Sequence, residues 1–172
     1  ALPAYIQLFY YQFTVWFAIG FGVASGIGQF LWWKVGRNKS IGDALFRPFL
    51  IAVLAGCAVL VGVWYGTDWS FSFDKEFSEW IKDEKLGGNV LSDGFSYVAY
   101  GIMSIADELL LFSSLFALVA NTDVLISLLR KNRKGLKVMG GTVVHIGFAL
   151  MLIGMLFSSG YDQVISKNLR PE

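Results

Sequence analysis

One uncharged stretch near the start of the chain decides the fold: residues 11–33 read YQFTVWFAIGFGVASGIGQFLWW. A helix needs about 20 apolar residues to cross the hydrocarbon core of a bilayer, which is about 30 Å thick. The stretch is long enough, and it ends on Trp32 and Trp33 followed by Lys34, as aromatic and basic residues do at a membrane–water interface. Residues 11–33 are therefore predicted to form a first transmembrane helix.

Three further apolar stretches have the same character. The second predicted span covers residues 48–65 and starts on Pro48, a residue suited to the first turn of a helix. The third is predicted at roughly residues 109–129, counted back from the basic cluster that follows it, and the fourth at residues 138–159. The chain is 55% hydrophobic and only 16% charged, which is too few charges for a soluble domain of 172 residues. The predicted fold class is all-α, a polytopic membrane helical bundle of about four transmembrane helices.

The segments between the spans differ in charge. The segments after spans one and three are basic, whereas residues 67–93 carry seven acidic residues against three lysines. Because short basic loops stay in the cytoplasm, both termini are predicted to lie on the outer face. The predicted organisation is a first transmembrane helix pair with a basic cytoplasmic loop (1–66), an acidic outer loop with a short amphipathic helix (67–96), and a second transmembrane helix pair with a basic cytoplasmic loop and a short outer tail (97–172).

Glycines recur within the predicted spans at spacings that allow helices to approach closely in lipid. They are Gly22 and Gly26, Gly62 and Gly66, and Gly140, Gly147 and Gly154. They are expected to serve helix packing before any chemistry.

Several function classes have no support in the sequence. The formal net charge is +1, so no basic surface points to a nucleic acid. The only cysteine, Cys57, lies in an apolar run and is expected to be a small buried residue, which leaves no disulfide framework and no CxxCH motif. No P-loop, HExxH or GxSxG motif occurs, and the only histidine lies too deep in a predicted span to serve a catalytic triad.

The only histidine, His145, lies about seven residues, or roughly 10 Å, inside the fourth span. A polar group at that depth needs a partner and is a functional candidate. One interpretation is a histidine hydrogen-bonded to a neighbouring helix. The other is a haem ligand, for which Gly141 and Gly147 would leave room beside the helix for a flat macrocycle. A second axial ligand would then have to come from outside this sequence.

Acidic residues near the third span give a further hypothesis. Asp123 is expected to reach the cytoplasmic interface or to pair with a basic residue there. Asp107 and Glu108 are expected to be a solvated helix end at the outer surface. A polar pathway through Asp123 and Asp107, as in a transporter, is the minority interpretation, since no paired broken helices are evident.

Two stretches resemble a known family. Residues 140–163, GGTVVHIGFALMLIGMLFSSGYDQ, are similar to the late transmembrane helix of the CcmF/CcsA cytochrome c haem lyases, in which a glycine-flanked histidine precedes a small and apolar run. Residues 10–35, YYQFTVWFAIGFGVASGIGQFLWWKV, resemble the family helix that ends in a glycine-rich segment before a basic cytoplasmic loop. Residues 67–93 have no counterpart in the resemblance.

The resemblance implies that His145 is an axial ligand of a transmembrane b-type haem, held in the bacterial inner membrane. It further implies that this haem takes electrons from quinol and keeps iron reduced while haem passes from a haem donor protein to apocytochrome c. The Trp-rich WWD segment and the two outer histidines of the family do not occur in this sequence. The chain is therefore expected to be part of a longer or split haem lyase, not competent alone, that works with the WWD-containing part or a partner subunit.

Overall fold

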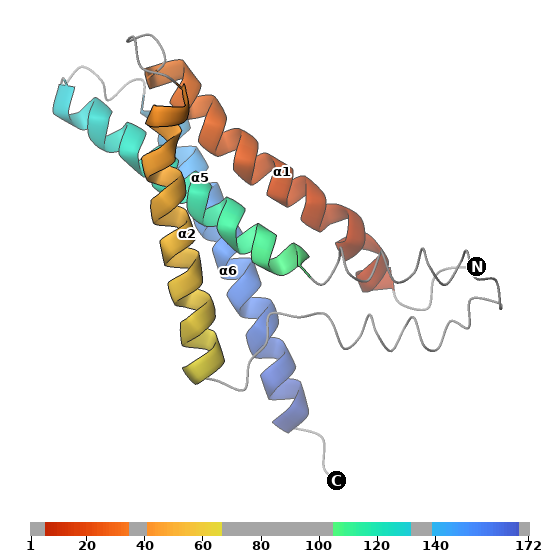
Figure 1. Ribbon diagram of the computed structural model, residues 1–172. Helices are drawn as coiled ribbons and strands as arrows, with labels where there is room; N and C mark the ends of the chain where they lie inside the picture. The colour runs from red at the N-terminus through yellow and green to blue at the C-terminus, as the bar shows by residue number, and fades with distance from the viewer. Residues whose placement is uncertain (1–5, 35–40, 67–104, 132–138, 169–172) are drawn as a thin grey trace, which may run out of the picture.

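The computed structural model describes residues 6–34, 41–66, 105–131 and 139–168 (Figure 1). They form four α-helices, which are α1 (Ile6–Lys34), α2 (Ile41–Gly66), α5 (Ala106–Lys131) and α6 (Gly140–Asn168). No strand occurs in this part of the chain, so the all-α prediction is confirmed for it. The amphipathic helix predicted within residues 67–96 lies outside the described residues.

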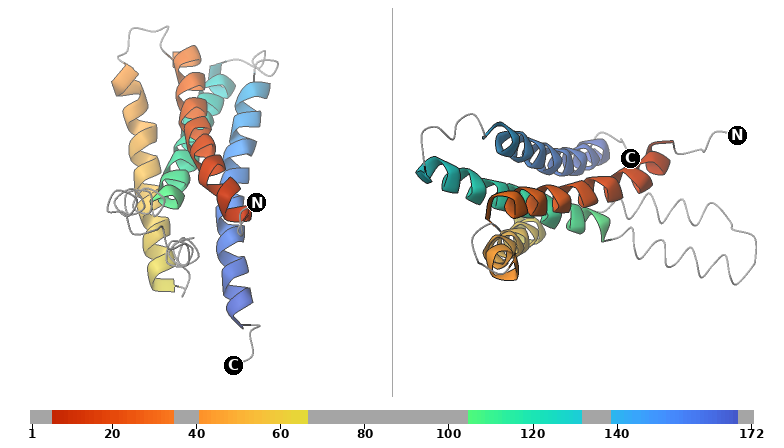
Figure 2. Two further views of the ribbon diagram at one scale, coloured as in Figure 1. Left: turned by 90° about the vertical axis from the view of Figure 1, so that its right-hand side faces the viewer. Right: turned by 90° about the horizontal axis from the view of Figure 1, so that it is seen from above.

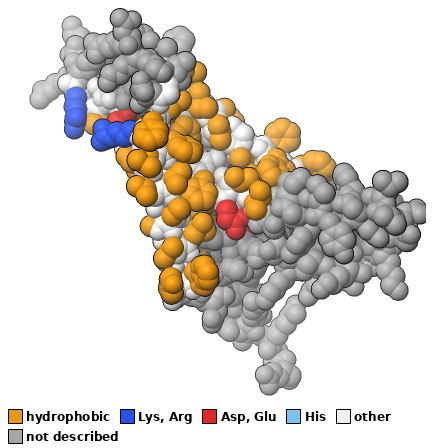
Figure 3. Space-filling model, viewed as in Figure 1, with side chains coloured by type: hydrophobic (Ala, Val, Ile, Leu, Met, Phe, Trp, Pro, Cys, Tyr) orange, Lys and Arg blue, Asp and Glu red, His pale blue; other side chains and the backbone are white. Residues whose placement is uncertain are grey.

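Three of these helices are long and apolar enough to cross a membrane. The candidate spans are Leu45–Tyr65 in α2, Ala106–Arg130 in α5 and Gly140–Ser158 in α6. The apolar segment of α1 is shorter, Phe13–Gly28, so a crossing by α1 stays a prediction. Hydrophobic side chains cover most of the visible described surface, and Lys and Arg side chains gather at one end of it (Figure 3). These lengths and compositions indicate a membrane protein.

Helix α5 lies at the centre of the bundle and contacts α1, α2 and α6 extensively. Half of its span is buried, against 17% for α2 and 22% for α6. Seen from above, α6 and α2 lie on opposite sides of the pair formed by α1 and α5 (Figure 2). Helix α1 therefore packs mainly on α5 and only slightly on α2, its neighbour in sequence.

The ends of α1 and α5 and the beginnings of α2 and α6 lie at the same end of the bundle (Figures 1 and 2). These four helix ends flank the two basic segments of the sequence. The alternating direction of the helices thus agrees with basic segments on one side, whichever side of the membrane that is.

Helix α2 begins earlier than predicted. It starts at Ile41, so Pro48 lies inside the helix and not in its first turn. A proline there leaves one backbone carbonyl of the preceding turn without its usual N–H donor, but such positions are tolerated in membrane helices when neighbouring groups compensate. Pro48 is fully buried, and Leu45, one turn earlier, packs against the cluster formed by α2 and α5. The burial of Pro48 and the packing of Leu45 thus support the helix at this position.

The glycines of α1 and those of α6 play different roles. Gly22 and Gly26 are buried, and α5 lies directly over them. Gly62, Gly140, Gly147 and Gly154 have nothing within 4 Å of the place where a Cβ would stand. The packing prediction therefore holds for α1, whereas the spaced glycines of α6 face away from the described helices. Cys57 is likewise exposed on α2, because its side of the helix meets no other described helix, so the expectation of burial was wrong.

Candidate functional site

His145 lies on the face of α6 that packs into the bundle. Ala149, Leu152 and Leu156 follow it at the spacing of one helix face, and all three are buried. The imidazole itself is half-buried. The helical periodicity of α6 therefore turns the only histidine of the chain toward the seam between α1 and α6.

A serine on α1 holds the imidazole. The Oγ of Ser25 lies 2.8 Å from Nδ1 of His145, and Ser25 is only 6% exposed. Ser25 stands between Gly22 and Gly26, whose missing side chains allow α1 to approach α5 closely. This hydrogen bond joins residues that are 120 positions apart in the chain.

A third helix contributes Asn121. Its Nδ2 donates to Ala117 O on its own helix at 2.7 Å and to Ser25 Oγ at 3.4 Å. Asn121 is fully buried. Ser25 thus connects α5 and α6 within the apolar part of the bundle.

Because Nδ1 of His145 is hydrogen-bonded to Ser25, the second ring nitrogen, Nε2, can bind another partner. If Nδ1–H donates to Ser25, Nε2 carries the free lone pair; if the serine hydroxyl donates to Nδ1, Nε2 carries the proton. Among the described residues, Nε2 has no hydrogen-bond partner. Only the first tautomer can bind a metal ion through Nε2.

Two further polar atoms near His145 are buried without a hydrogen bond. They are Oδ1 of Asn121 and Oγ1 of Thr142, which precedes His145 by three residues on α6. Both residues are 0% exposed. We call Ser25, Asn121, Thr142 and His145 the polar cluster. Its unmet hydrogen-bonding capacity costs stability unless another molecule supplies partners.

Aromatic rings border the polar cluster on the α1 side. The ring of Phe21 lies 6.5 Å from the imidazole of His145, measured between centroids, and 4.7 Å from the ring of Phe148 in an edge-on arrangement. Phe21 is 52% exposed, so this side of the seam is also an outer surface of the described bundle.

The two glycines predicted to flank a haem occupy different positions. Gly141 is one turn from His145 on the same side of α6, and it is exposed. Gly147 is two residues away, or about 200° around the helix, so the open space beside it does not adjoin the imidazole. Only Gly141 leaves room on the side of His145.

The acidic residues of α5 lie far apart along the helix. Asp107 and Glu108 lie in the first turn of α5, where negative charge suits the helix dipole. Asp107 is 6% exposed and Oε2 of Glu108 is buried, so the expectation of a solvated helix end was wrong. Asp123 is sixteen residues further along α5, about 24 Å from Asp107. A polar pathway through Asp107 and Asp123 stays a prediction.

Within the described residues, no group of three or more His, Cys, Asp or Glu side chains could hold a metal ion. His145 is therefore a candidate for a single ligand to a group that brings its own other ligands, as haem does. Ser25 and Asn121 were not predicted as site residues. The signal that could have suggested Ser25 is its place between two glycines at close-packing spacing.

No family model, curated protein or solved structure matches this chain. A function for this chain is therefore inferred from its own sequence and side-chain contacts.

Proposed function

We propose that this chain is a membrane part of a cytochrome c maturation haem lyase, in which His145 is an axial ligand of a transmembrane b-type haem. The sequence resemblance of residues 10–35 and 140–163 motivates the proposal. The observation that supports it most is the hydrogen bonding of the imidazole. Nδ1 of His145 is hydrogen-bonded to Ser25, and Nε2 has no partner among the described residues. A ring nitrogen left without a partner inside a membrane calls for a ligand.

The described residues suit one axial position of a haem. Metal-bound histidines usually donate their second ring N–H to a hydrogen-bond acceptor, which fixes the tautomer and the ring orientation. The buried Oγ of Ser25 is placed to accept from Nδ1–H, and Asn121 holds Ser25 from the other side. Gly141 keeps the same side of α6 free of a side chain. When bound, haem supplies one-electron transfer.

Three features of the proposal go beyond these contacts. The second axial ligand comes from a partner or from the WWD-containing part, because this sequence has no second histidine. The haem supports reduction and transfer of haem to apocytochrome c, with quinol as a possible electron source. The protein resides in the bacterial inner membrane with both termini of this chain on the periplasmic face, as the basic segments between the helices favour.

The test compares His145→Ala and His145→Gln in the purified protein by optical spectroscopy and redox titration. Glutamine can keep a hydrogen bond to Ser25 but is not a haem ligand. We expect both variants to lose the sharp reduced α-band, while His145→Gln keeps more of the thermal stability than His145→Ala. If His145→Ala retains the same b-haem absorbance and midpoint potential as the parent, the assignment is wrong. Ser127→Ala is the matched control, since Ser127 is exposed and bonds only within α5.

A second candidate has an observation in its favour. A non-enzymatic membrane subunit that packs against larger partners would use His145 as a hydrogen-bonded packing residue. The inward face of α6 and the 2.8 Å bond to Ser25 favour this role. Absence of any haem spectrum in the intact complex, together with lower stability of both His145 variants, would support it over the haem proposal.

A further inference from the structure

The hydroxyl of Ser25 makes its hydrogen bonds to other helices and not to its own. A serine inside a helix can donate to the carbonyl one turn earlier, as Ser127 does to Asp123 O at 2.7 Å. Ser25 has no such bond among the described residues. Its two partners are Nδ1 of His145 on α6 and Nδ2 of Asn121 on α5. The hydroxyl proton of Ser25 therefore has to be accepted by one of these two side chains.

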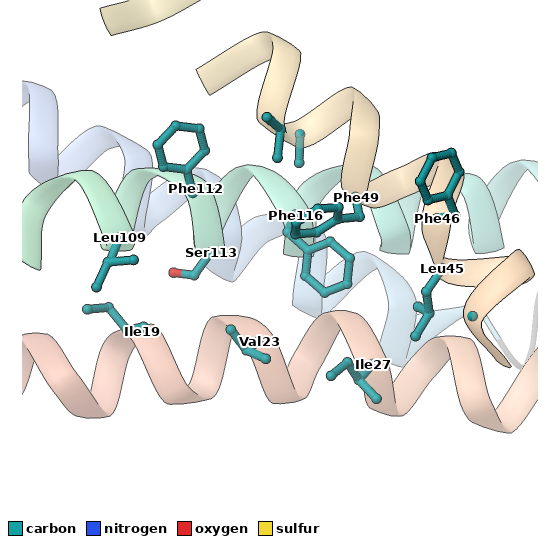
Figure 4. A pocket seen from close by; sticks show the side chains of 13 residues that line it. Ile19, Val23, Ile27, Leu45, Phe46, Phe49, Leu109, Phe112, Ser113 and Phe116 are labelled. Atoms are coloured by element: carbon teal, nitrogen blue, oxygen red, sulfur yellow. The ribbon is translucent and has the colours of Figure 1, made fainter. Parts of the chain in front are cut away.

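The face of α1 on which Ser25 stands is set by its apolar neighbours. Val23 and Ile27 line an apolar pocket that α1 forms with α2 and α5 (Figure 4). The one hydroxyl in that lining, Ser113, already donates to Leu110 O at 3.0 Å. Ser25 is two residues from Val23, or about 200° around the helix, so it lies on the side of α1 turned away from the pocket.

Asn121 can only donate to Ser25. Its Nδ2 lies 2.7 Å from Ala117 O, and only the amide nitrogen can make a hydrogen bond to a carbonyl oxygen, which fixes the orientation of the amide. The same nitrogen lies 3.4 Å from Oγ of Ser25. Oδ1, the one acceptor of this side chain, has no hydrogen-bond partner. Asn121 thus occupies one lone pair of Ser25 and does not accept its proton.

The acceptor left to the Ser25 hydroxyl among the described residues is Nδ1 of His145, at 2.8 Å. If the ring proton were on Nδ1, Ser25 would accept twice, and its own proton would stay unpaired in a side chain that is only 6% exposed. If the ring proton is on Nε2, the hydroxyl donates to the Nδ1 lone pair and is satisfied. Nε2 has no described partner in either tautomer, so it does not alter the comparison. An unpaired buried donor is costly enough to favour the second tautomer by about tenfold or more.

We propose that Ser25 is a positioning residue that selects the tautomer of His145. In the haem-free chain its hydroxyl donates to Nδ1, and Nε2 carries the ring proton. The imidazole then offers a hydrogen-bond donor at Nε2 in place of a lone pair that could bind a metal.

The second half of the proposal rests on the proposed function. Ligation of haem through Nε2 requires the other tautomer, so the ring proton leaves Nε2, a proton is taken up at Nδ1, and the ring stays neutral. Ser25 then accepts from Nδ1–H, and its own proton can turn to Phe21 O, one turn earlier on α1, in the manner of Ser127. One hydrogen bond between α1 and α6 thus has opposite directions in the haem-free and the haem-bound chain.

NMR of the haem-free protein tests the tautomer without any substitution. The protein is made in haem-deficient cells with ¹⁵N-labelled histidine and studied in detergent in mildly alkaline buffer. Because the chain has one histidine, the spectrum contains a single pair of ring nitrogens. Nε2 couples to both carbon-bound ring protons and Nδ1 mainly to one, which distinguishes them. We expect Nδ1 at the shift of an unprotonated nitrogen and Nε2 at that of a protonated one. A protonated Nδ1 would overturn the proposal.

Ser25→Ala tests whether Ser25 is the cause. Without the hydroxyl donor the Nδ1 signal should shift, whereas Ser127→Ala, which removes a hydroxyl that bonds only within α5, should leave it where the parent has it. An unchanged Nδ1 signal in a folded Ser25→Ala protein would show that Ser25 does not select the tautomer.

Zinc protoporphyrin tests the reversal, because it is a diamagnetic porphyrin that takes one axial ligand. When it binds the labelled protein, Nε2 should lose its proton and Nδ1 should move to the shift of a protonated nitrogen. An Nδ1 that stays unprotonated in the bound protein would overturn the reversal. Failure of His145 to ligate the porphyrin would overturn haem ligation and the reversal together, while the tautomer of the haem-free chain would stand on its own spectrum.

Discussion

The hydroxyl of Ser25 connects three helices through one atom. It bonds Nδ1 of His145 at 2.8 Å and accepts a longer bond from Asn121. The neighbouring Oγ1 of Thr142 has no partner although the residue is fully buried. Oδ1 of Asn121 likewise lacks a partner, so Ser25 makes the hydrogen bonds that join the three helices and is the member of the polar cluster whose removal should cost most.

Replacing Ser25 with alanine should lower the free energy of unfolding by about 1 kcal/mol, as expected for a hydrogen bond between membrane helices. The loss arises because Nδ1 of His145 and Nδ2 of Asn121 lose their shared partner. Thermal unfolding in detergent measures it. Ser127→Ala removes a hydroxyl of the same kind that bonds only to Asp123 O on its own helix, so it should unfold as the parent does. Equal stability of the two variants would contradict the role given to Ser25.

The sequence predicted the place of His145 better than its partners. Its depth within an apolar helix required a partner, and the structure supplies one in Ser25. Which residue that would be could not be predicted, because it lies 120 positions away and depends on how α1 and α6 pack. Whether the ring also binds haem stays a prediction, since the polar contacts of Nδ1 suit both interpretations.

At the level of the helices, similar glycine spacings lead to different outcomes. Gly22 and Gly26 receive side chains of α5, whereas Gly140, Gly147 and Gly154 on α6 meet nothing in the described part of the chain. Glycine spacing shows that another helix could pack closely against this one. Whether a helix does pack there depends on the arrangement of the bundle. The same limit explains Pro48, whose position inside α2 depends on packing that no local pattern reveals.

Gly26→Ala should destabilise the bundle by about 1–3 kcal/mol, because its Cβ would stand 2.6 Å from the ring of Phe116 and force the helices to shift. Gly28→Ala, on the same helix with nothing within 4 Å, should be neutral or stabilise by up to about 1 kcal/mol. Thermal unfolding of the two variants compares them directly. Adding Phe116→Leu to Gly26→Ala should recover part of the loss. A loss of stability as large in Gly28→Ala as in Gly26→Ala would mean that contact with Phe116 is not the cause.

For the whole molecule, the sequence predicted four transmembrane helices and their approximate ends, and the described part of the chain has four helices, of which three are candidate spans. Hydropathy sets these lengths because lipid requires long apolar segments. It says nothing of which helix is central, and α5 holds that place although its first turn carries Asp107 and Glu108. Buried polar groups of α5 are acceptable there because other helices surround them.

The orientation of the bundle can be tested with single cysteines in a Cys57→Ser background. Asn38→Cys and Asn132→Cys, in the two basic segments, should react with a membrane-impermeant maleimide only after the inner membrane is opened. Ser92→Cys, in the acidic outer loop as predicted, should react in intact spheroplasts. The parent protein is the control, since Cys57 lies on a face of α2 within its candidate span and should stay unlabelled. The reverse pattern would show that the bundle is inverted.

The central position of α5 also constrains biosynthesis. Helices α1 and α2 leave the ribosome before α5, yet they scarcely touch each other and meet mainly through α5. Until α5 is inserted, Ser25 and the glycines beside it face lipid without their partners. During synthesis α1 and α2 are therefore inserted before they are assembled. Substitutions on the packed face of α5 should prolong this unassembled state, allow its degradation and so lower the amount of protein in the membrane.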